Sequence, residues 1–159
     1  MTDDGARVRD AFAGVAAVAF DFDGVLVDSV DVKTRAFAAL YVDEDPALQA
    51  AVVRHHLAHG GISRHVKLAH YERLRTGADP DPDRLATLAD RFADSVMEHV
   101  IAAPELPGAT MLLESLVPQL PLFVASGTPE DELCAIVTAR GWDRFFAGVF
   151  GSPADRGRR

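Results

Sequence analysis

The sequence has 159 residues, a length that suits one globular domain or a domain that carries a small insertion. Hydrophobic residues make up 48% of the chain and charged residues 25%, which excludes a mainly disordered protein. The formal net charge of −8 argues against a nucleic-acid partner, because phosphate backbones are bound mainly by Lys and Arg.

Targeting and redox signals are few. Cys134 is the only cysteine, so no intrachain disulfide can form, and a reducing compartment is expected. Residues 1–10 lack the basic start and the long apolar run of a signal peptide. The apolar stretch at residues 11–20 is shorter than the roughly 20 residues that span a bilayer. We therefore expect a cytoplasmic protein with no membrane partner.

The first predicted element is a strand. Residues 15–20 form a short apolar run that ends abruptly at Asp21-Phe22-Asp23-Gly24. Such a run is typical of a strand buried on both faces of a parallel sheet that helices cover. A helix of the same length is the alternative, although two acids and a glycine would continue it poorly.

The stretch from residue 30 to residue 103 predicts helices only. We expect helices over about residues 32–40 and 46–59, and a third that Ser63 could cap and that runs towards Arg75. The clearest helix follows residue 83, because its apolar residues recur at spacings of three and four. Pro104 and Pro107-Gly108 end this stretch.

Strands and helices alternate in the remainder. Residues 109–116 predict a helix, 120–125 a buried strand and 147–150 a third strand. Between these strands, Thr128 is expected to cap a helix whose first position is Pro129. Alternation of this kind predicts an α/β fold with a parallel sheet. We assign residues 1–29 and 104–159 to this core and residues 30–103 to an inserted helical cap.

Two acids follow the first strand. Asp21 and Asp23 should lie at the carboxyl edge of the sheet, where open parallel sheets bind ligands. One carboxylate could attack phosphorus and form an aspartyl phosphate, and the second could exchange protons with the leaving group and with water. Such a pair also attracts Mg²⁺, and Gly24 would let the backbone turn sharply. An acidic surface turn is the plainer alternative.

The run V-A-F-D-F-D-G-V-L-V-D-S at residues 18–29 resembles the first motif of the haloacid dehalogenase (HAD) superfamily. The resemblance implies a three-layer, Rossmann-like core with a helical cap. It makes Asp21 the nucleophile and Asp23 the acid/base, with both contributing to the Mg²⁺ site. Because dehalogenases of the superfamily usually lack the second acid, Asp23 favours phosphoryl transfer.

Two further stretches are similar to motifs of this superfamily. Leu122 to Thr128 resembles the second motif, which implies that Ser126 and Gly127, together with Gly24, bind the phosphoryl group. Gly60 to Arg64, followed by Lys67, resembles the substrate-facing part of helical caps. Arg64 could clamp a phosphate or carboxylate there, although an Arg in the first turn of a helix is otherwise usually a solvated charge.

The resemblance fails near the C-terminus. Arg156 stands where the third motif would place a Lys, and it is equally readable as part of a basic tail. No residues follow Arg159 to supply the acidic fourth motif, so we expect an incomplete core, weak metal binding and a truncated or frameshifted product. The strand before Asp21 would then form an open sheet edge and invite self-association.

Three functions remain open. The leading hypothesis is Mg²⁺-dependent hydrolysis of a small phosphorylated metabolite, similar to phosphoglycolate or a sugar phosphate. The alternatives are an inactive fragment or binding-only protein, and a phosphomutase. The six histidines fall within residues 55–99 without the carboxylates or cysteines that would complete a metal site.

Overall fold

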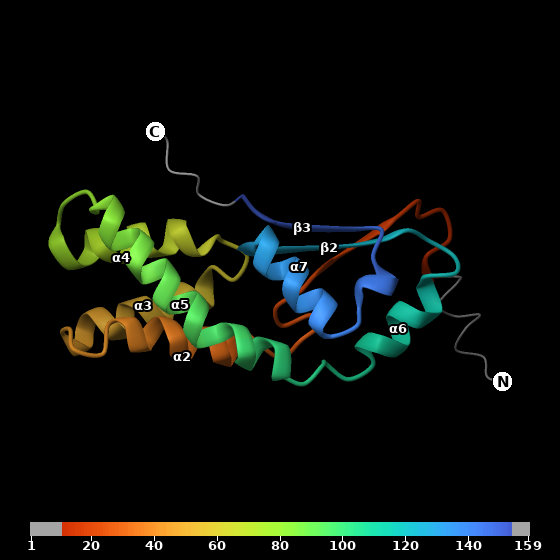
Figure 1. Ribbon diagram of the computed structural model, residues 1–159, viewed down its shortest axis with the longest axis horizontal. Coiled ribbons are helices and arrows are strands. Elements are labelled where there is room, and N and C mark those ends of the chain that lie inside the picture. Colours follow the sequence, from red (N-terminus) through yellow and green to blue (C-terminus); the bar gives the residue numbers. More distant parts are fainter. Residues whose placement is uncertain (1–10, 154–159) are drawn as a thin grey trace.

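The structure, a computed structural model, describes residues 11–153 (Figure 1). The described part of the chain forms a small sheet with a group of helices at one end. The strands are β1 (Val18–Asp21), β2 (Leu122–Pro129) and β3 (Gly148–Ser152). The helices are α2 (Val30–Leu40), α3 (Pro46–Ala58), α4 (Arg64–Thr76), α5 (Pro82–Ala102), α6 (Ala109–Leu116) and α7 (Glu130–Ala139), with a 3₁₀ turn at Asp143–Phe145.

The sheet is parallel throughout, with strand order β1-β2-β3. Val18 lies opposite Leu122, and Val124 lies opposite both Phe20 of β1 and Val149 of β3. The α/β class with a parallel sheet is therefore confirmed. β1 pairs only with β2 among the described residues, so the strand that carries Asp21 is a sheet edge.

Of the three layers predicted for the core, the described residues form two: the sheet and one layer of helices. Both connections advance across the sheet in the same direction, and such connections are right-handed, so α6 and α7 lie on the same face (Figure 1). The opposite face carries Ala19, Ala125 and Phe150, all exposed, and Phe150 is 54% exposed. A second helical layer over that face is not found between residues 11 and 153.

The burial predicted for the first strand is wrong for the same reason. Ala19 and Asp21 are exposed, whereas Val18 and Phe20 are half-buried. The alternation arises because α6 and α7 cover one face only. An apolar run as short as residues 15–20 reads alike whether one face of the strand or both are covered, so periodicity could not separate the two cases.

The helical block, α2 to α5, leaves the core and returns to it at adjacent points. The Asp28 amide donates to the Pro104 carbonyl at 2.9 Å, and the Leu106 amide donates to the Leu26 carbonyl at 3.0 Å. The guanidinium of Arg140, just after α7, donates to the carbonyl of Ala103 at 2.8 Å. Because these bonds pair backbone groups at the end of α5, they fix the block against the core.

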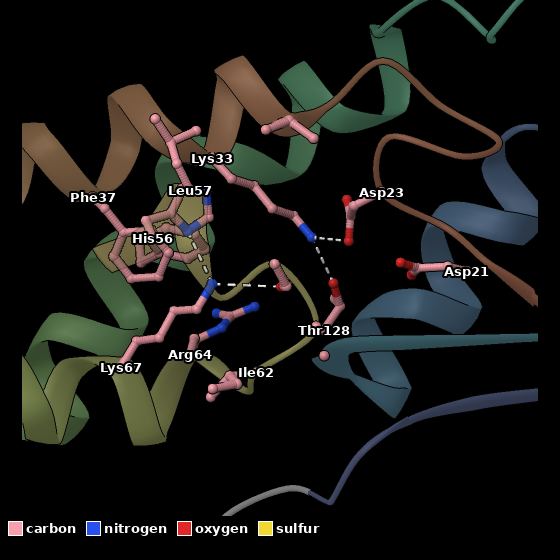
Figure 2. Close-up of a pocket in the computed structure, with 15 residues that line it drawn as sticks. Asp21, Asp23, Lys33, Phe37, His56, Leu57, Ile62, Arg64, Lys67 and Thr128 are labelled. Atoms are coloured by element: carbon pink, nitrogen blue, oxygen red, sulfur yellow. Dashed lines mark hydrogen bonds and ion pairs between the residues drawn. The ribbon is translucent and has the colours of Figure 1, made fainter. Parts of the chain in front are cut away.

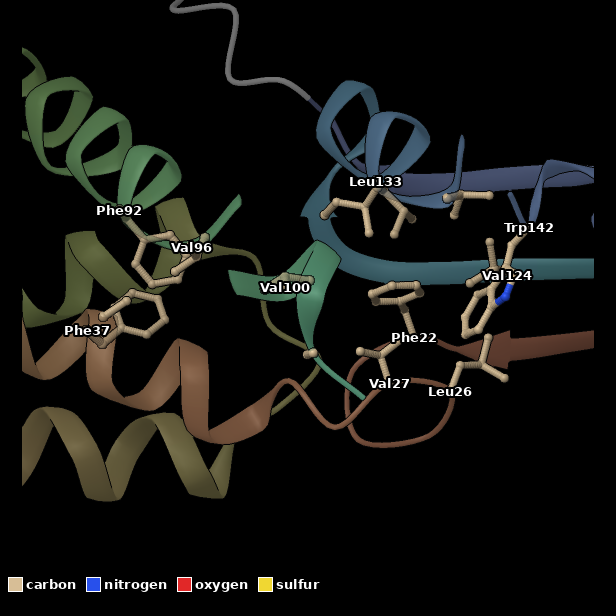
Figure 3. Close-up of a cluster of buried hydrophobic side chains, with 14 of the residues drawn as sticks. Phe22, Leu26, Val27, Phe37, Phe92, Val96, Val100, Val124, Leu133 and Trp142 are labelled. Atoms are coloured by element: carbon tan, nitrogen blue, oxygen red, sulfur yellow. The ribbon is translucent and has the colours of Figure 1, made fainter. Parts of the chain in front are cut away.

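Apolar side chains from the helical block and from the sheet region pack into one core cluster (Figure 3). In the block, the ring centroids of Phe37 and Phe92 are 4.2 Å apart. In the core, Phe22 packs edge-on against Trp142 at 6.4 Å. Val100, near the end of α5, lies between these two parts of the cluster. The loop after β1 is thus anchored by Phe22 and the helical block by Phe37.

Most predicted helices are confirmed, but their caps differ. Ser63 occupies the N-cap position of α4 without a side-chain hydrogen bond to the backbone. The cap predicted at Thr128 is wrong, because β2 continues to Pro129 and Pro129 itself is the N-cap of α7. The Thr128 hydroxyl instead contacts Lys33. Of the helices in residues 11–153, none combines the length and the hydropathy needed to cross a membrane.

Removal of the Phe37 ring should destabilise the whole fold. Phe37 is 1% exposed and its ring contacts those of His56, Tyr71 and Phe92. We expect Phe37→Ala to lower the free energy of unfolding by about 3–5 kcal/mol in urea denaturation. Leu74→Ala, at a half-exposed position of α4, should cost less than about 0.5 kcal/mol. Equal losses would contradict a block held together by this cluster.

Candidate active site

The loop after β1 is a tight, anchored turn. The Leu26 and Val27 amides donate to the Phe22 carbonyl at 3.0 and 3.1 Å, and the Gly24 amide donates to the Val27 carbonyl at 2.8 Å. Gly24 has φ +74°, and a Cβ there would lie 2.9 Å from a Val30 methyl. Gly24 therefore makes the turn possible, and it does not line the cavity described below.

Asp21 and Asp23 flank the buried Phe22 and have contrasting environments. The Asp21 side chain is exposed, and among residues 11–153 it accepts a hydrogen bond only from the Phe22 amide, at 2.7 Å. Asp23 accepts the Ser29 hydroxyl at 2.6 Å, the Lys33 ammonium at 2.5 Å and the Ser126 hydroxyl at 3.0 Å. Both carboxylates line one cavity, as the sequence predicts for the sheet edge.

Asp23 is held in its ionised form. Burial alone would raise the pKa of Asp23, but the Lys33 ammonium and the Ser29 and Ser126 hydroxyls outweigh that effect and lower it. Charge-assisted hydrogen bonds of this kind favour the carboxylate over the acid. Asp23 thus rests ionised and accepts three hydrogen bonds, while the Asp21 carboxylate faces the cavity.

Sequence reasoning missed Lys33 as a site residue. Its ammonium bridges Asp23 and the Thr128 hydroxyl, which it contacts at 2.8 Å (Figure 2). The signal was present in the spacing, since Ser29 and Lys33 are four residues apart and share one face at the start of α2. Both side chains reach the same carboxylate.

The end of β2 brings the predicted second-motif residues to the same place. The Ser126 hydroxyl contacts Asp23 and also accepts the Thr128 amide at 3.1 Å. Gly127 lines the cavity, and a Cβ there would lie 2.9 Å from the Gly61 carbonyl oxygen. Gly127 thus lets the loop before α4 approach the sheet edge closely. Arg156 lies outside the described residues.

A cavity of about 170 Å³ separates the sheet edge from the helical block (Figure 2). The sheet edge contributes carboxylates and the Thr128 hydroxyl, whereas the block contributes cations and rings. Its lining from the block includes Lys33, Phe37, His56, Arg64, Lys67 and Phe92. The structure therefore brings Arg64 to the same cavity as Asp21 and Asp23.

Arg64 is buried and already paired. Its side chain is 6% exposed, so the solvated surface position considered from the sequence is wrong. The guanidinium forms an ion pair with Glu132 of α7, donates to the Ala89 carbonyl at 3.3 Å and lies 5.0 Å from the Phe92 ring centroid. This ion pair joins the helical block to the core across one side of the cavity.

His56 and Lys67 form a buried pair at the block end. The Lys67 ammonium donates to His56 Nδ1 at 3.0 Å, so that nitrogen carries a lone pair. Burial, reinforced by Lys67 and Lys33, lowers the pKa of His56 to about 4. Burial, with Lys33 second, lowers the pKa of Lys67 to about 8. Both pKa values are lowered because burial and neighbouring positive charges disfavour the protonated forms of His56 and Lys67.

The donor set suits a loosely held Mg²⁺. Asp21 and Asp23 supply hard carboxylate oxygens at the sheet edge, and Mg²⁺ commonly takes one or two carboxylates with water and phosphate oxygens completing its shell. Within residues 11–153, no cluster of three or more acidic, His or Cys side chains could hold a metal ion. Since Asp23 is already hydrogen-bonded three times, the Asp21 carboxylate is the freer ligand.

Acidification should destabilise the fold through His56. Its folded pKa of about 4 lies below the ordinary 6.5, so the unfolded chain binds a proton in that window that the folded chain rejects. The free energy of unfolding should fall by on the order of 2–3 kcal/mol as the pH drops from 6.5 to 4.

Urea denaturation across this pH range checks the expectation. His56→Gln should flatten the decline, whereas His99→Gln, at an exposed position of α5, should retain it. An unchanged slope in His56→Gln would show that another group governs the acid transition.

The chain is similar in fold to solved structures of other proteins. A search of curated proteins gave no significant match. Solved structures that resemble the chain include a predicted phosphatase from Clostridium acetobutylicum, with a TM-score of 0.66 and 21% identity. That match covers 89% of this chain and 63% of the relative.

Two other structures add information. A predicted phosphoglycolate phosphatase from Haemophilus somnus 129PT has a TM-score of 0.64 and 20% identity, and the match covers 85% of this chain and 61% of that protein. A HAD-type hydrolase from Bacillus subtilis, described as bound to magnesium, has a TM-score of 0.59 and 17% identity, with coverages of 86% and 65%. The chain thus spans less than two thirds of the length of these relatives.

The family model of haloacid dehalogenase-like hydrolases matches residues 15–157, which include both acids of the loop and the end of β2. The parallel sheet, the helical block and this match agree with the resemblance seen in residues 18–29. The chain belongs to the haloacid dehalogenase-like hydrolase family.

Proposed function

We propose that the chain hydrolyses a small phosphomonoester through an aspartyl phosphate on Asp21, with Mg²⁺ as cofactor. One observation carries the proposal: an open carboxylate and a clamped, ionised carboxylate face the same cavity from one loop. The phosphatases among the related structures and the magnesium-bound relative support it.

The two carboxylates would divide the chemistry. A substrate that enters as its phosphate monoanion would pass its proton to the ionised Asp23. An Asp21 oxygen attacks phosphorus as the bond to the ester oxygen breaks, and Asp23 gives that proton to the leaving oxygen. Asp23, ionised again, then removes a proton from water, whose oxygen attacks phosphorus as the bond to Asp21 breaks, and the proton leaves with the phosphate. Bound Mg²⁺ would neutralise phosphoryl charge beside Asp21.

Charge stabilisation would also come from Lys33. Its ammonium reaches Asp23 and the Thr128 hydroxyl, so a phosphoryl group at Asp21 would lie near a fixed positive charge. The Ser126 hydroxyl and the backbone at Gly127 border the same edge and would donate to phosphoryl oxygens. We also propose Arg156, which stands where the third motif would place a Lys, as a further cation for the phosphoryl group.

Binding without turnover is the second candidate. It is favoured by the missing third acid around Asp21 within the described residues, which leaves few ligands to retain Mg²⁺. A chain of this kind would hold phosphorylated ligands in the cavity and release them unchanged.

Phosphate release from an aryl phosphate separates the candidates. With Mg²⁺ present, the 159-residue chain should release phosphate, and chelator should stop the release. Asp21→Asn should be inactive because the amide is a poor nucleophile, and Asp23→Asn should lose about 10²–10⁴-fold in kcat.

Circular dichroism and thermal melting should first show that each variant is folded. Thr87→Ala, on the exposed side of α5, serves as a control that should match the wild type. A folded wild type without Mg²⁺-dependent release would contradict hydrolysis and leave ligand binding as the function.

A further inference from the structure

Three histidine side chains of the helical block come together beside the cavity but do not line it. His55 lies in the last turn of α3, and His59 is the C-cap residue of that helix. Their ring centroids are 4.2 Å apart, and the ring planes differ by 21°. His70 of α4 stacks on His55, also at 4.2 Å. The fold therefore gathers imidazoles from two helices that the proposed hydrolysis does not use.

The spacing of His55 and His59 is that of a metal-binding pair. Residues four apart lie on one face of a helix, and histidines at this spacing recur as zinc ligands. His59 has left the helical backbone conformation, with φ −132° and ψ 58°. The stacked rings nevertheless show that its side chain still lies over that of His55.

Hydrogen bonds within the protein occupy the Nδ1 atom of both rings. His59 Nδ1 lies 3.0 Å from the His55 carbonyl oxygen. Since a carbonyl only accepts, Nδ1 carries the proton and Nε2 of the neutral ring carries the lone pair. His55 Nδ1 lies 3.2 Å from the hydroxyl of the buried Tyr71, whose oxygen can accept from it in the same way. A ring held through one nitrogen offers the other to a metal ion, as metal-bound histidines do.

The charges around the pair decide which ion it suits. Burial, followed by His70, His59 and Lys67, lowers the pKa of His55, so its ring is uncharged near neutral pH. The Lys67 ammonium also repels a dication, so the affinity has to come from the imidazole lone pairs. Imidazole suits ions such as Zn²⁺, whereas Mg²⁺ prefers oxygen ligands.

We propose that Nε2 of His55 and Nε2 of His59 bind one Zn²⁺ ion, with water in its remaining positions. Two protein ligands suffice, so the site differs from the clusters of three or more that residues 11–153 lack. His70 holds the His55 ring by stacking on it, and Tyr71 holds its Nδ1 atom. The inference is independent of the proposed hydrolysis, because the Mg²⁺ site uses other residues and other ligand atoms.

The ion would fix the end of α3 where the chain enters the loop that borders the cavity. Gly60 and Gly61 line the cavity directly after His59. The Gly61 carbonyl oxygen lies 2.9 Å from the position that a Cβ of Gly127 would take, so this loop packs against the end of β2. Bound Zn²⁺ would therefore hold the loop in place and stabilise the block.

Calorimetric titration of the whole chain with Zn²⁺ tests the pair. The wild type should bind one ion at least about tenfold more tightly than His59→Gln does. His99→Gln is the matched control, because His99 Nδ1 also lies 3.1 Å from a carbonyl four residues earlier, but that residue is Ser95. This variant should retain the wild-type affinity. Tyr71→Phe should weaken binding by about tenfold or more, since it removes the group that orients His55.

Imidazole ¹⁵N spectra identify the ligand atoms. Zn²⁺ should shift the Nε2 signals of His55 and His59 most, and Mg²⁺ should shift neither. At saturating Zn²⁺, the melting temperature of the wild type should rise by at least about 3 °C, and that of His59→Gln should rise by less.

The outcomes separate this site from the sheet edge. With every variant folded by circular dichroism, equal Zn²⁺ affinity in His59→Gln and the wild type would overturn the proposal. Largest Nε2 shifts at other histidines would also overturn it, as would a site that is lost in Asp21→Asn and kept in His59→Gln. A site lost in His59→Gln and kept in Asp21→Asn would support it, whether or not the chain hydrolyses phosphate esters.

Discussion

The ion pair between Asp23 and Lys33 is the interaction on which the site depends. It joins the loop after β1 to the first helix of the block, and through Thr128 it reaches the end of β2. The loop after β1 and the neighbouring start of α2 therefore meet the end of β2, which follows about 100 residues later, at one carboxylate. Because the pair is mostly buried, loss of either partner would leave an uncompensated charge at the cavity wall. The hydroxyls of Ser29 and Ser126 complete this arrangement.

Charge is distributed unequally across the cavity. The sheet edge holds the hydrogen-bonded carboxylate of Asp23 and the exposed carboxylate of Asp21, whereas the block presents the Lys67 ammonium, hydrogen-bonded to a neutral His56. The Arg64–Glu132 pair then ties the two sides together. The two sides of the cavity therefore differ in charge, with carboxylates at the sheet edge and cations on the helical block.

Sequence patterns predicted the parallel fold, the helical stretch and the sheet edge that carries Asp21 and Asp23. They failed where tertiary contacts decide. The one-sided burial of β1 depends on which helical layers cover the sheet. The Thr128 hydroxyl accepts a hydrogen bond from Lys33 and does not cap a helix. Arg64 is buried where it pairs with Glu132, which is 68 residues away in sequence. Lys33 was within reach of local reasoning, because its spacing from Ser29 places both on one face of α2.

The most direct test of the central claim is ¹⁹F NMR of the chain with Mg²⁺ and beryllium fluoride, an analogue that binds a carboxylate as a phosphoryl group does. The wild type should give bound fluoride signals that disappear in Asp21→Asn and on addition of chelator. Signals that persist in Asp21→Asn, or their absence from the folded wild type, would contradict Asp21 as the phosphoryl acceptor.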